Sequence, residues 1–524
     1  MSNLSKILVS AGFVNALSWV VLIPIWQYPD EQSHFAQVQD IAEFGSTPKL
    51  GPNTSEEVAV SEKFLDTERD GLGNNKFTYH PEYHISYTTS DEGVYEKLLN
   101  ALPNETKTYM YKWEATDNPP LYHVMASNFY NLFRQNNLLD RVFAVRIFSL
   151  FLFLCLIVIS INAGNIIFKK DILSQTVLPA LMTFTPMLVF STTGVLPDPL
   201  TILLFTLIFT ISAKIVRDKL TIQLFILLII LLFLGTFTRQ QFQVAIPIVL
   251  ISVYYGLSKM LPKRFVIYAS TAITLCAFIL GAIFAVKHKL IFSVAEIGSP
   301  DLRLLLTSQF EKYLLSTLSH YYSQTLPWYW GVYKWLSLTL PHIYYQIINR
   351  IIVLSVIGLG VWIAITLRNK KIFKQDLIMA LFIFSIFIYF AVFIIWDFYF
   401  QLVFGYSFGI QGRYFLPLAL PITTLLLFGI KNLFQLFIKK YLHIALFILT
   451  FIMVLFNDVS LYIVTSSYYE SVALKTFTNQ VSQYKPLIFK GDTVIIILVL
   501  NILMQLTFLF YLFNFISTKN EKYR

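Results

Sequence analysis

Three acidic residues and one histidine have the types and positions needed to handle a proton. Asp30 and Glu31 follow directly after a long apolar run, and His34 lies one helical turn further along. Asp198 stands between two prolines in a short connection that contains no other charge. A carboxylate can accept the proton of a hydroxyl group during group transfer. We therefore predict that Asp30, Glu31 and Asp198 are catalytic residues.

Each of these acids also has a purely structural interpretation. Aspartate is a good helix N-cap, and an acid in the first turn of a helix is stabilised by the helix dipole. Asp30 and Glu31 stand at the start of one expected helix, and Asp198 stands at the start of another. Capping is therefore the alternative to catalysis at all three positions.

Two arginines have the surroundings expected of phosphate ligands. Arg239 is the only charge in a tight turn between two apolar runs, and Arg413 occurs in the sequence Gln411-Gly412-Arg413-Tyr414 just before another run. The guanidinium group presents a planar fork of donors that matches phosphate oxygens, and Gly412 would let a ligand approach the backbone. The alternative for each arginine is that its side chain snorkels to lipid headgroups.

Snorkelling is our interpretation of three other arginines near the ends of apolar runs. These are Arg141, Arg146 and Arg350. His80 and His84 have a spacing that could place both on a metal, but Pro81 lies between them and no third ligand is close in sequence. The sequence therefore assigns no certain cofactor and leaves a divalent cation open.

Acids that activate a hydroxyl, together with cations that hold a phosphate, suit group transfer from a lipid-linked phosphate donor. A polyprenyl chain on that donor would lie between membrane helices. This chemistry requires that side chains separated by several hundred positions meet in one pocket just outside the bilayer.

The elements that must position these groups are membrane helices. The chain has 524 residues, of which 56% are apolar and 13% are charged, whereas an ordinary soluble domain carries about 25% charged residues. These values exclude a soluble globular protein. The only cysteines, Cys155 and Cys276, lie inside apolar runs, so we expect no disulfide framework and no thiolate metal site.

We predict an all-α polytopic membrane protein with about 12 transmembrane helices, because backbone groups in lipid must be paired within their own segment. The run from Leu220 to Leu257 is too long for one span and must fold back near Arg239. The runs are approximately Ile7 to Trp26, Val142 to Ile167, Leu173 to Phe190, Leu200 to Val216, Leu220 to Phe237, Phe242 to Leu257, Phe265 to Val286, Ile347 to Leu367, Leu377 to Trp396, Tyr414 to Ile430, Tyr441 to Phe456 and Val494 to Ile516.

The basic residues of the short loops set the predicted orientation. All the short basic clusters fall on one side if the N-terminus is cytoplasmic, and Lys and Arg are enriched in cytoplasmic loops. We therefore predict a multi-pass protein of the cell membrane with both termini cytoplasmic and the active site on the exterior face. The net charge of +10 is then explained by anchorage against anionic lipid, and no nucleic-acid partner is expected.

The sequence divides into five predicted regions. They are a first transmembrane helix (1–26), a large exterior loop (27–140), transmembrane helices 2–7 (141–286), an exterior loop (287–346) and transmembrane helices 8–12 (347–524). Within the first exterior loop, amphipathic spacing predicts surface helices over Glu31 to Phe44 and Leu121 to Phe133. Its middle part, Gly45 to Asn75, has no clear periodicity and is predicted to be loop.

Five motifs occur in order along the chain. They are Pro29-Asp30-Glu31 with His34-Phe35, Pro119-Pro120-Leu121-Tyr122, Arg146-Ile147-Phe148-Ser149, Trp330-Gly331-Val332-Tyr333-Lys334-Trp335 and Gln411-Gly412-Arg413-Tyr414. This ordered set resembles a family of uncharacterised bacterial predicted membrane proteins, and the resemblance extends to about Pro421. That family in turn is similar to the GT-C superfamily of integral-membrane glycosyltransferases.

The resemblance implies a GT-C-like fold with a long first exterior loop that bears juxtamembrane helices. It also implies a polyprenyl-phosphate-sugar donor and an active site at the exterior face. The superfamily's first-loop acid would be Asp30 or Glu31, and its acid after the third span would be Asp198. A turn that often reads Thr-Lys-Gly in relatives reads Thr238-Arg239-Gln240 here, so the charge is kept and the glycine is lost.

We predict a glycosyltransferase that moves a sugar from a polyprenyl-phosphate donor to a glycan or lipid acceptor of the cell envelope. Arg239 and Arg413 would hold the donor phosphate. A polymerase or ligase of lipid-linked glycans and a flippase or transporter are the alternatives, but a transporter should place ionisable groups near the bilayer midplane. The predicted substrate-binding residues are His34, Tyr122, Trp328, Trp330 and Gln411.

Overall fold

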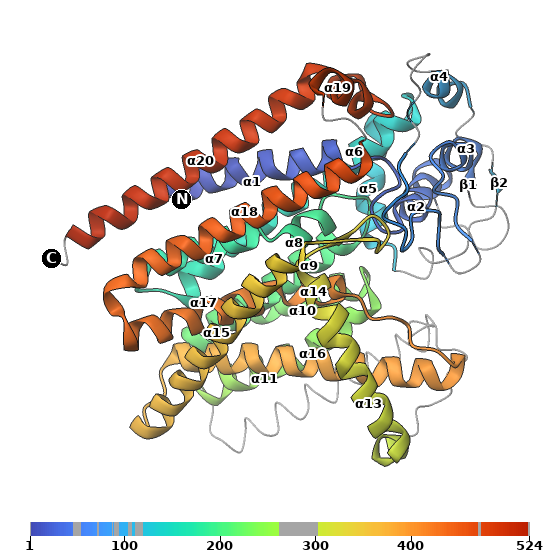
Figure 1. Cartoon of the computed structure of the whole chain (residues 1–524). Coiled ribbons are helices and arrows are strands. Elements are labelled where there is room, and N and C mark those ends of the chain that lie inside the picture. Colours follow the sequence, from blue (N-terminus) through green and yellow to red (C-terminus); the bar gives the residue numbers. More distant parts are fainter. Residues whose placement is uncertain are drawn as a thin grey trace.

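The computed structural model in Figure 1 describes residues 2–45, 54–70, 73–85, 87, 94–102, 107–109, 119–260, 302–469 and 473–521. Helices make up most of the described residues, so the predicted all-α class is confirmed. The only strands among them form two short antiparallel pairs. β1 (Thr54–Ser55) pairs with β2 (Lys107–Tyr109), and β3 (Val332–Tyr333) pairs with β4 (Leu338–Thr339) so that Val332 lies opposite Thr339.

Nine helical segments of the described residues are long and apolar enough to cross a membrane. Three of these segments include the 3-10 turn that precedes the helix, and the segment within α20 stops before the last residues of that helix. They are α1 (Asn3–Leu22), α6 (Leu138–Ile167), α9 (Asp198–Arg217), α11 (Ala245–Ser258) with η1 (Gln240–Val244), α15 (His342–Asn369), α16 (Lys374–Phe404), α17 (Ala419–Phe437) with η4 (Gly412–Leu418), α18 (Leu442–Tyr468) with η5 (Lys439–Tyr441), and α20 (Asp492–Glu521). Each corresponds to one predicted run. The run over Phe265 to Val286 lies outside the described residues.

The two remaining runs form shorter helices. α10 (Ile222–Thr236) is separated from η1 at Arg239, as the length of that apolar stretch predicted. The run over Leu173 to Phe190 forms α7 (Ile172–Thr183) and α8 (Pro186–Ser191) instead of one helix. Pro186 explains this break, because proline lacks an N–H donor and disfavours helical geometry in the residue before it.

A small polar lobe lies at one end of the helix bundle and contains α2 (Glu31–Phe44), α3 (Glu56–Phe64), α4 (Val94–Asn100) and α5 (Leu121–Leu132). Figure 1 shows the lobe at the right, whereas the N-terminus and the C-terminus both lie on the left side of the bundle. The lobe follows α1 and precedes α6 in the chain, as the large first loop predicted. The remaining short helices lie in two segments of the chain. The first contains η2 (Leu302–Leu306), α13 (Ser308–His320), the π-helical turn η3 (Tyr321–Thr325) and α14 (Leu326–Trp330). The second contains α19 (Leu474–Ser482) and η6 (Leu487–Phe489).

Two expectations for this lobe were wrong. α2 has the predicted bounds, but it is not a surface helix, since all residues from Glu31 to Asp40 are buried. The stretch that was predicted to be loop contains α3, which starts at Glu56. Both errors have one cause: polar residues of these helices find charged partners inside the lobe, as when Glu57 receives two hydrogen bonds from Arg141 at 2.8 and 2.6 Å.

Close contacts hold the helices of the bundle together. α1 packs against α6 and α20, and its Asn15 exchanges two amide hydrogen bonds with Asn457 of α18 at 3.3 and 2.6 Å. α15 lies against α17 where Gly358 meets Gly429, since a Cβ added to Gly358 would lie only 1.9 Å from the Gly429 carbonyl oxygen. Most of the rest of the α15 surface faces outward.

Candidate active site

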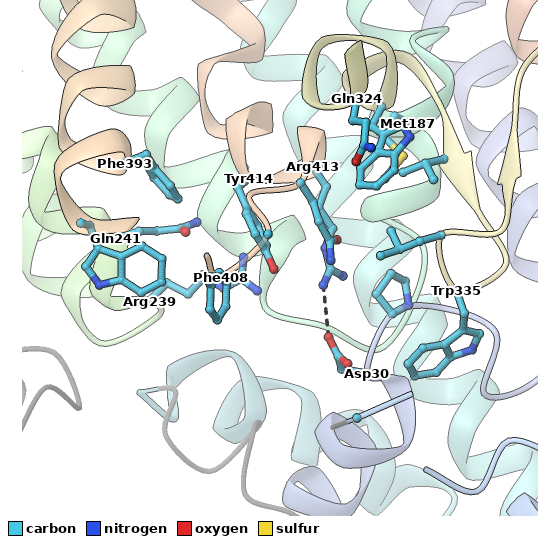
Figure 2. Close-up of a pocket in the computed structure, with 18 of the residues that line it drawn as sticks. Asp30, Met187, Arg239, Gln241, Gln324, Trp335, Phe393, Phe408, Arg413 and Tyr414 are labelled. Atoms are coloured by element: carbon cyan, nitrogen blue, oxygen red, sulfur yellow. Dashed lines mark hydrogen bonds and ion pairs between the residues drawn. The ribbon is translucent and has the colours of Figure 1, made fainter. Parts of the chain in front are cut away.

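A cavity of about 840 Å³ lies between the lobe and the ends of the membrane helices (Figure 2). Its walls come from the start of α2, from η1 and the start of α11, from the segment between α13 and β4, and from α16 through η4. Six of the predicted site residues line it, among them Asp30, Arg239 and Arg413. The gathering of distant polar groups that the sequence required is therefore present for these three.

Asp30 directs its side chain toward arginines and not toward the helix that it precedes. It is the N-cap of α2 with φ at 56°, and its side chain makes no capping hydrogen bond. Aspartate tolerates this left-handed backbone geometry better than most residues. The carboxylate accepts a hydrogen bond from Nη2 of Arg413 at 3.2 Å and lies 3.6 Å from Nη1 of Arg69. The capping alternative is therefore wrong for the side chain of Asp30.

Arg413 is held almost buried beside Asp30, and Figure 2 shows the two side chains facing each other. Within the described part of the chain its Nε has no hydrogen-bond partner. Gly412 precedes it and packs against α14, because an added Cβ would lie 2.1 Å from the backbone N of Tyr329 and 2.4 Å from the carbonyl carbon of Trp328. The expectation that Gly412 opens the backbone to a ligand is wrong. The glycine instead allows η4 to approach α14.

Arg239 lines the cavity and pairs with Asp198 on its other side. Arg239 is the N-cap of η1, and Asp198 is the first residue of α9. Asp198 does not itself line the cavity, and its Oδ2 has no partner in the described part of the chain. Neither Asp198 nor Asp30 thus acts as a side-chain cap.

Glu31 lies next to Asp30 in sequence but points away from the cavity. Its carboxylate accepts hydrogen bonds from Nε and Nη2 of Arg146 at 2.8 and 2.6 Å. It also accepts from the backbone N of Trp26 at 3.0 Å and of Val195 at 3.2 Å. Both charged side chains are fully buried. Glu31 therefore accepts four hydrogen bonds from three residues, and these bonds join α2 to the segment after α1, to α6 and to the segment before α9.

The expectation that Arg141 and Arg146 snorkel to lipid is wrong. Every N–H group of the Arg146 guanidinium has an acceptor, since the three that do not bind Glu31 donate to the carbonyls of Val20, Ile23 and Pro24 at 3.2, 2.7 and 2.9 Å. The last carbonyls of a helix lack hydrogen-bond donors within the helix. Arg146 provides such donors at the end of α1 and just after it. Arg141 is buried in its pair with Glu57.

His34 also lines the cavity and is bonded to a second histidine. Its Nδ1 lies 3.1 Å from Nε2 of His123 on α5, and the two rings stack with centroids 5.3 Å apart. Burial, and then Arg239, Arg413 and Arg69, hold the pKa of His34 well below its usual range. Burial likewise lowers the pKa of His123, which is completely enclosed. His123 was not among the predicted residues.

The other predicted substrate-binding residues divide into two groups. Trp328 and Gln411 line the cavity. Tyr122 and Trp330 do not: the Tyr122 hydroxyl is buried at 2.8 Å from the hydroxyl of Ser149, and Trp330 is buried beside the ring of Tyr329.

An apolar wall of the cavity was missed entirely. Ile388, Val392 and Trp396 lie four residues apart along one face of α16, and they face the cavity together with Val244 and Pro247. Figure 2 shows Phe393 and Phe408 near this wall, beside Arg239 and Gln241. Because α16 is apolar on all sides, its sequence gives no signal that would single out this face.

A tight turn between β3 and β4 closes the opposite wall. Lys334, Trp335 and Leu336 all have positive φ, at 49°, 53° and 65°. Trp335 lines the cavity and donates from Nε1 to the carbonyl of Trp26 at 3.2 Å. Lys334 donates to the carbonyls of Pro81 and Ser467 at 3.0 Å each, and burial lowers the pKa of this amine to about 8.

No group of three or more His, Cys, Asp or Glu side chains that could hold a metal ion occurs in the described residues. The cavity lining includes the cationic side chains of Arg239, Arg413 and Lys334. Two of them, Arg239 and Arg413, come from separate membrane helices and are held in place by Asp198 and Asp30.

Comparisons with known proteins place the chain in a family. No curated protein matches the sequence. A solved archaeal oligosaccharyltransferase from Archaeoglobus fulgidus, in complex with an inhibitory peptide and a dolichol-phosphate, is similar to the fold with a TM-score of 0.43 and 11% identity over 88% of this chain. The match spans 56% of that longer chain. The model of the family described as "Predicted membrane protein (DUF2142)" matches residues 13–422, so this chain belongs to that family.

Proposed function

We propose that the protein transfers a sugar from a polyprenyl-phosphate-linked donor to a glycan or lipid acceptor of the cell envelope, in the manner of GT-C-type glycosyltransferases. One observation carries this proposal. Asp30 and Arg413, 383 positions apart in the sequence, bind each other in a cavity that Arg239 also lines. A carboxylate and two cations that could bind a phosphate thus share one space at the end of the membrane helices.

The two arginines would hold the donor phosphate. A phosphate that links a sugar to a polyprenyl chain carries one negative charge, and it gains a second when the sugar leaves. Guanidinium groups match phosphate oxygens geometrically and stabilise charge that develops in the transition state. The Nε of Arg413 is a buried donor without a partner in the described part of the chain, so it is available to an anion.

The apolar wall would hold the first isoprene units of the donor. The face of α16 that carries Ile388, Val392 and Trp396 runs from the cavity along the membrane-spanning helix. A chain of branched hydrocarbon gains about 25 cal/mol per Å² when it is removed from water onto such a surface. This arrangement places the phosphate at the polar end of the cavity and the lipid along α16.

The α2 side of the cavity would take up the proton of the acceptor hydroxyl. Asp30 is the acid that the sequence predicted for this step, and it is the predicted acid whose side chain lines the cavity. Gln411 and Trp328 remain the candidates for contacts with the sugar, because amides bond hydroxyl groups and aromatic faces pack on pyranose rings. The basic short loops predict that the lobe, and with it this cavity, lies on the exterior side of the membrane.

The test uses purified protein in lipid nanodiscs and a polyprenyl phosphate as probe. Hydrogen bonds to a charged group contribute about 1.5–3 kcal/mol, so R239A and R413A should each weaken probe binding by roughly 10- to 150-fold. R350A is the matched control, because Arg350 is an exposed arginine of α15 outside the cavity. Release of sugar from a panel of radiolabelled polyprenyl-phosphate hexoses and pentoses, with water as acceptor, reports turnover.

Unchanged probe binding in both arginine variants would contradict the proposal. So would movement of the intact donor across the bilayer of proteoliposomes without any release of sugar, which would favour a flippase. Transfer of chains longer than one sugar would instead identify a polymerase or ligase of lipid-linked glycans.

A further inference from the structure

His34 and His123 form a bonded pair at the wall of the cavity. His34 is on the same side of α2 as Asp30, four residues later, and faces the cavity. His123 stands behind it on α5, completely buried, and its Nδ1 has no partner in the described part of the chain. Burying two imidazoles with an unsatisfied nitrogen costs stability. Such a cost is typical of a functional site.

The geometry of the pair limits its protonation. A hydrogen bond between Nδ1 of His34 and Nε2 of His123 needs one N–H and one lone pair. Two imidazolium ions would bring two N–H groups together, so the pair can carry at most one extra proton. When His34 donates its Nδ1 proton to His123, its Nε2 carries a lone pair on the side of the ring that lies away from His123. The pair is then a neutral base at the edge of the cavity.

The charges that face His34 come from every element around it. Asp30 lies on its own helix, Arg69 on the segment after α3, Arg239 on η1, Arg413 on η4 and the neutral His123 on α5. Positive charges dominate, so His34 stays unprotonated at neutral pH, which a base requires. A phosphate bound to Arg239 and Arg413 would offset these charges, and its second negative charge would make His34 more basic as the sugar leaves.

We propose that His34 is the catalytic base of the transfer and that His123 is a positioning residue that holds its ring and tautomer. This inference rests on the proposed function. In the step, the acceptor O–H bond breaks and its proton moves to Nε2 of His34, while the oxygen forms a bond to the anomeric carbon. The bond from that carbon to the phosphate oxygen breaks, and its electron pair leaves with the phosphate. Asp30 then fixes Arg413 and Arg69 beside the reacting groups.

The first test compares H34Q with wild-type protein in the sugar-release assay. Loss of a general base lowers the rate by about 10²- to 10⁴-fold, so kcat of H34Q should fall by that factor while the Kd for polyprenyl phosphate stays within about threefold. H80Q is the matched control, because His80 is an exposed histidine of the lobe outside the cavity. Added imidazole should restore part of the activity of H34G, which separates lost chemistry from lost folding.

The second test uses pH. A base works only when unprotonated, so kcat of the wild type should be constant above about pH 6.5 and fall as the pH drops through the lowered pKa of His34. R69Q removes one charge that lowers this pKa, so its acidic limb should move to higher pH. H123Q keeps a polar atom for Nδ1 of His34 and should retain activity within about tenfold of wild type, whereas H123L should lose considerably more.

The outcomes of these tests either support or contradict the assignment of His34 as the base. If H34Q keeps wild-type kcat, or if the acidic limb persists in H34Q and disappears in D30N, then Asp30 is the base and the inference is wrong. If H34Q loses probe binding in proportion to its rate, His34 is a binding residue only. Wild-type protein that neither binds polyprenyl phosphate nor releases sugar would instead refute the proposed function itself.

Discussion

Two adjacent acids, Asp30 and Glu31, should give opposite phenotypes when they are neutralised. Replacing Glu31 by glutamine leaves the guanidinium of Arg146 buried with no counter-charge, and it weakens the bonds to the backbone N–H groups of Trp26 and Val195. Replacing Asp30 by asparagine changes a side chain at the cavity that is about 29% exposed. The first change should affect folding, and the second should affect activity.

The magnitude of the Glu31 effect follows from burial. Removing one partner of a fully buried ion pair costs about 3–5 kcal/mol, and both partners here are 0% exposed. At roughly 2 °C per kcal/mol for a chain of this size, E31Q should lower the melting temperature by about 6–10 °C. R146Q should have a similar effect. The double variant should be little worse than either single variant, because the second change removes a charge that is already unpaired.

The measurement is thermal unfolding of detergent-solubilised protein. Samples are heated to a series of temperatures, and size-exclusion chromatography then gives the fraction that remains folded. D30N is the matched control and should melt within about 1–2 °C of wild type while its sugar release falls. An E31Q protein with wild-type melting temperature and no turnover would refute this assignment, and it would return Glu31 to the catalytic residues. Simple additivity of E31Q and R146Q would show that the two charges do not depend on each other.

Three further predictions concern packing and pH. G412A should lower the melting temperature and weaken polyprenyl phosphate binding by about tenfold, since overpacking costs about 1–3 kcal/mol and the added Cβ would push Arg413 away; normal binding would contradict this. G358A should lower the melting temperature without changing probe binding, because the contact with Gly429 lies outside the cavity; equal loss of binding would contradict it. Lys334 loses its proton near pH 8 in the folded protein, whereas the unfolded chain keeps it to about 10.5. The unfolded state therefore binds more protons between these values, so stability should rise with pH across that window in wild type and not in K334M; parallel melting curves would count against this.

The membrane fold could be predicted closely because apolar runs report helices directly. The bounds of α2 and α5 were also predicted to within one residue. The interior of the lobe could not be predicted, because its helices bury charged residues against one another. A pattern of apolar positions gives no information on such pairs, so Arg141 and Arg146 were interpreted as arginines that snorkel to lipid headgroups.

For the candidate site, charge in an otherwise uncharged turn was the useful signal. It identified Arg239 and Asp198, which pair with each other. Arg413 was identified by its position before an apolar run, and it lines the cavity with Asp30 and Arg239. Sequence could not decide between Asp30 and Glu31, because neighbouring residues on a helix point about 100° apart and only the packing shows which one faces the cavity. His123 gave no signal, since a single histidine in an amphipathic helix is an ordinary residue until its partner is known.

The enclosure of α1 has a consequence for how the protein is made. α1 leaves the ribosome well before α20, yet the two helices pack against each other. The carbonyls at the end of α1 also lack the hydrogen bonds from Arg146 until α6 has been made. A nascent chain therefore carries α1 through most of its synthesis without the helix that covers it. A chain that stops before α20 leaves that face of α1 without its partner.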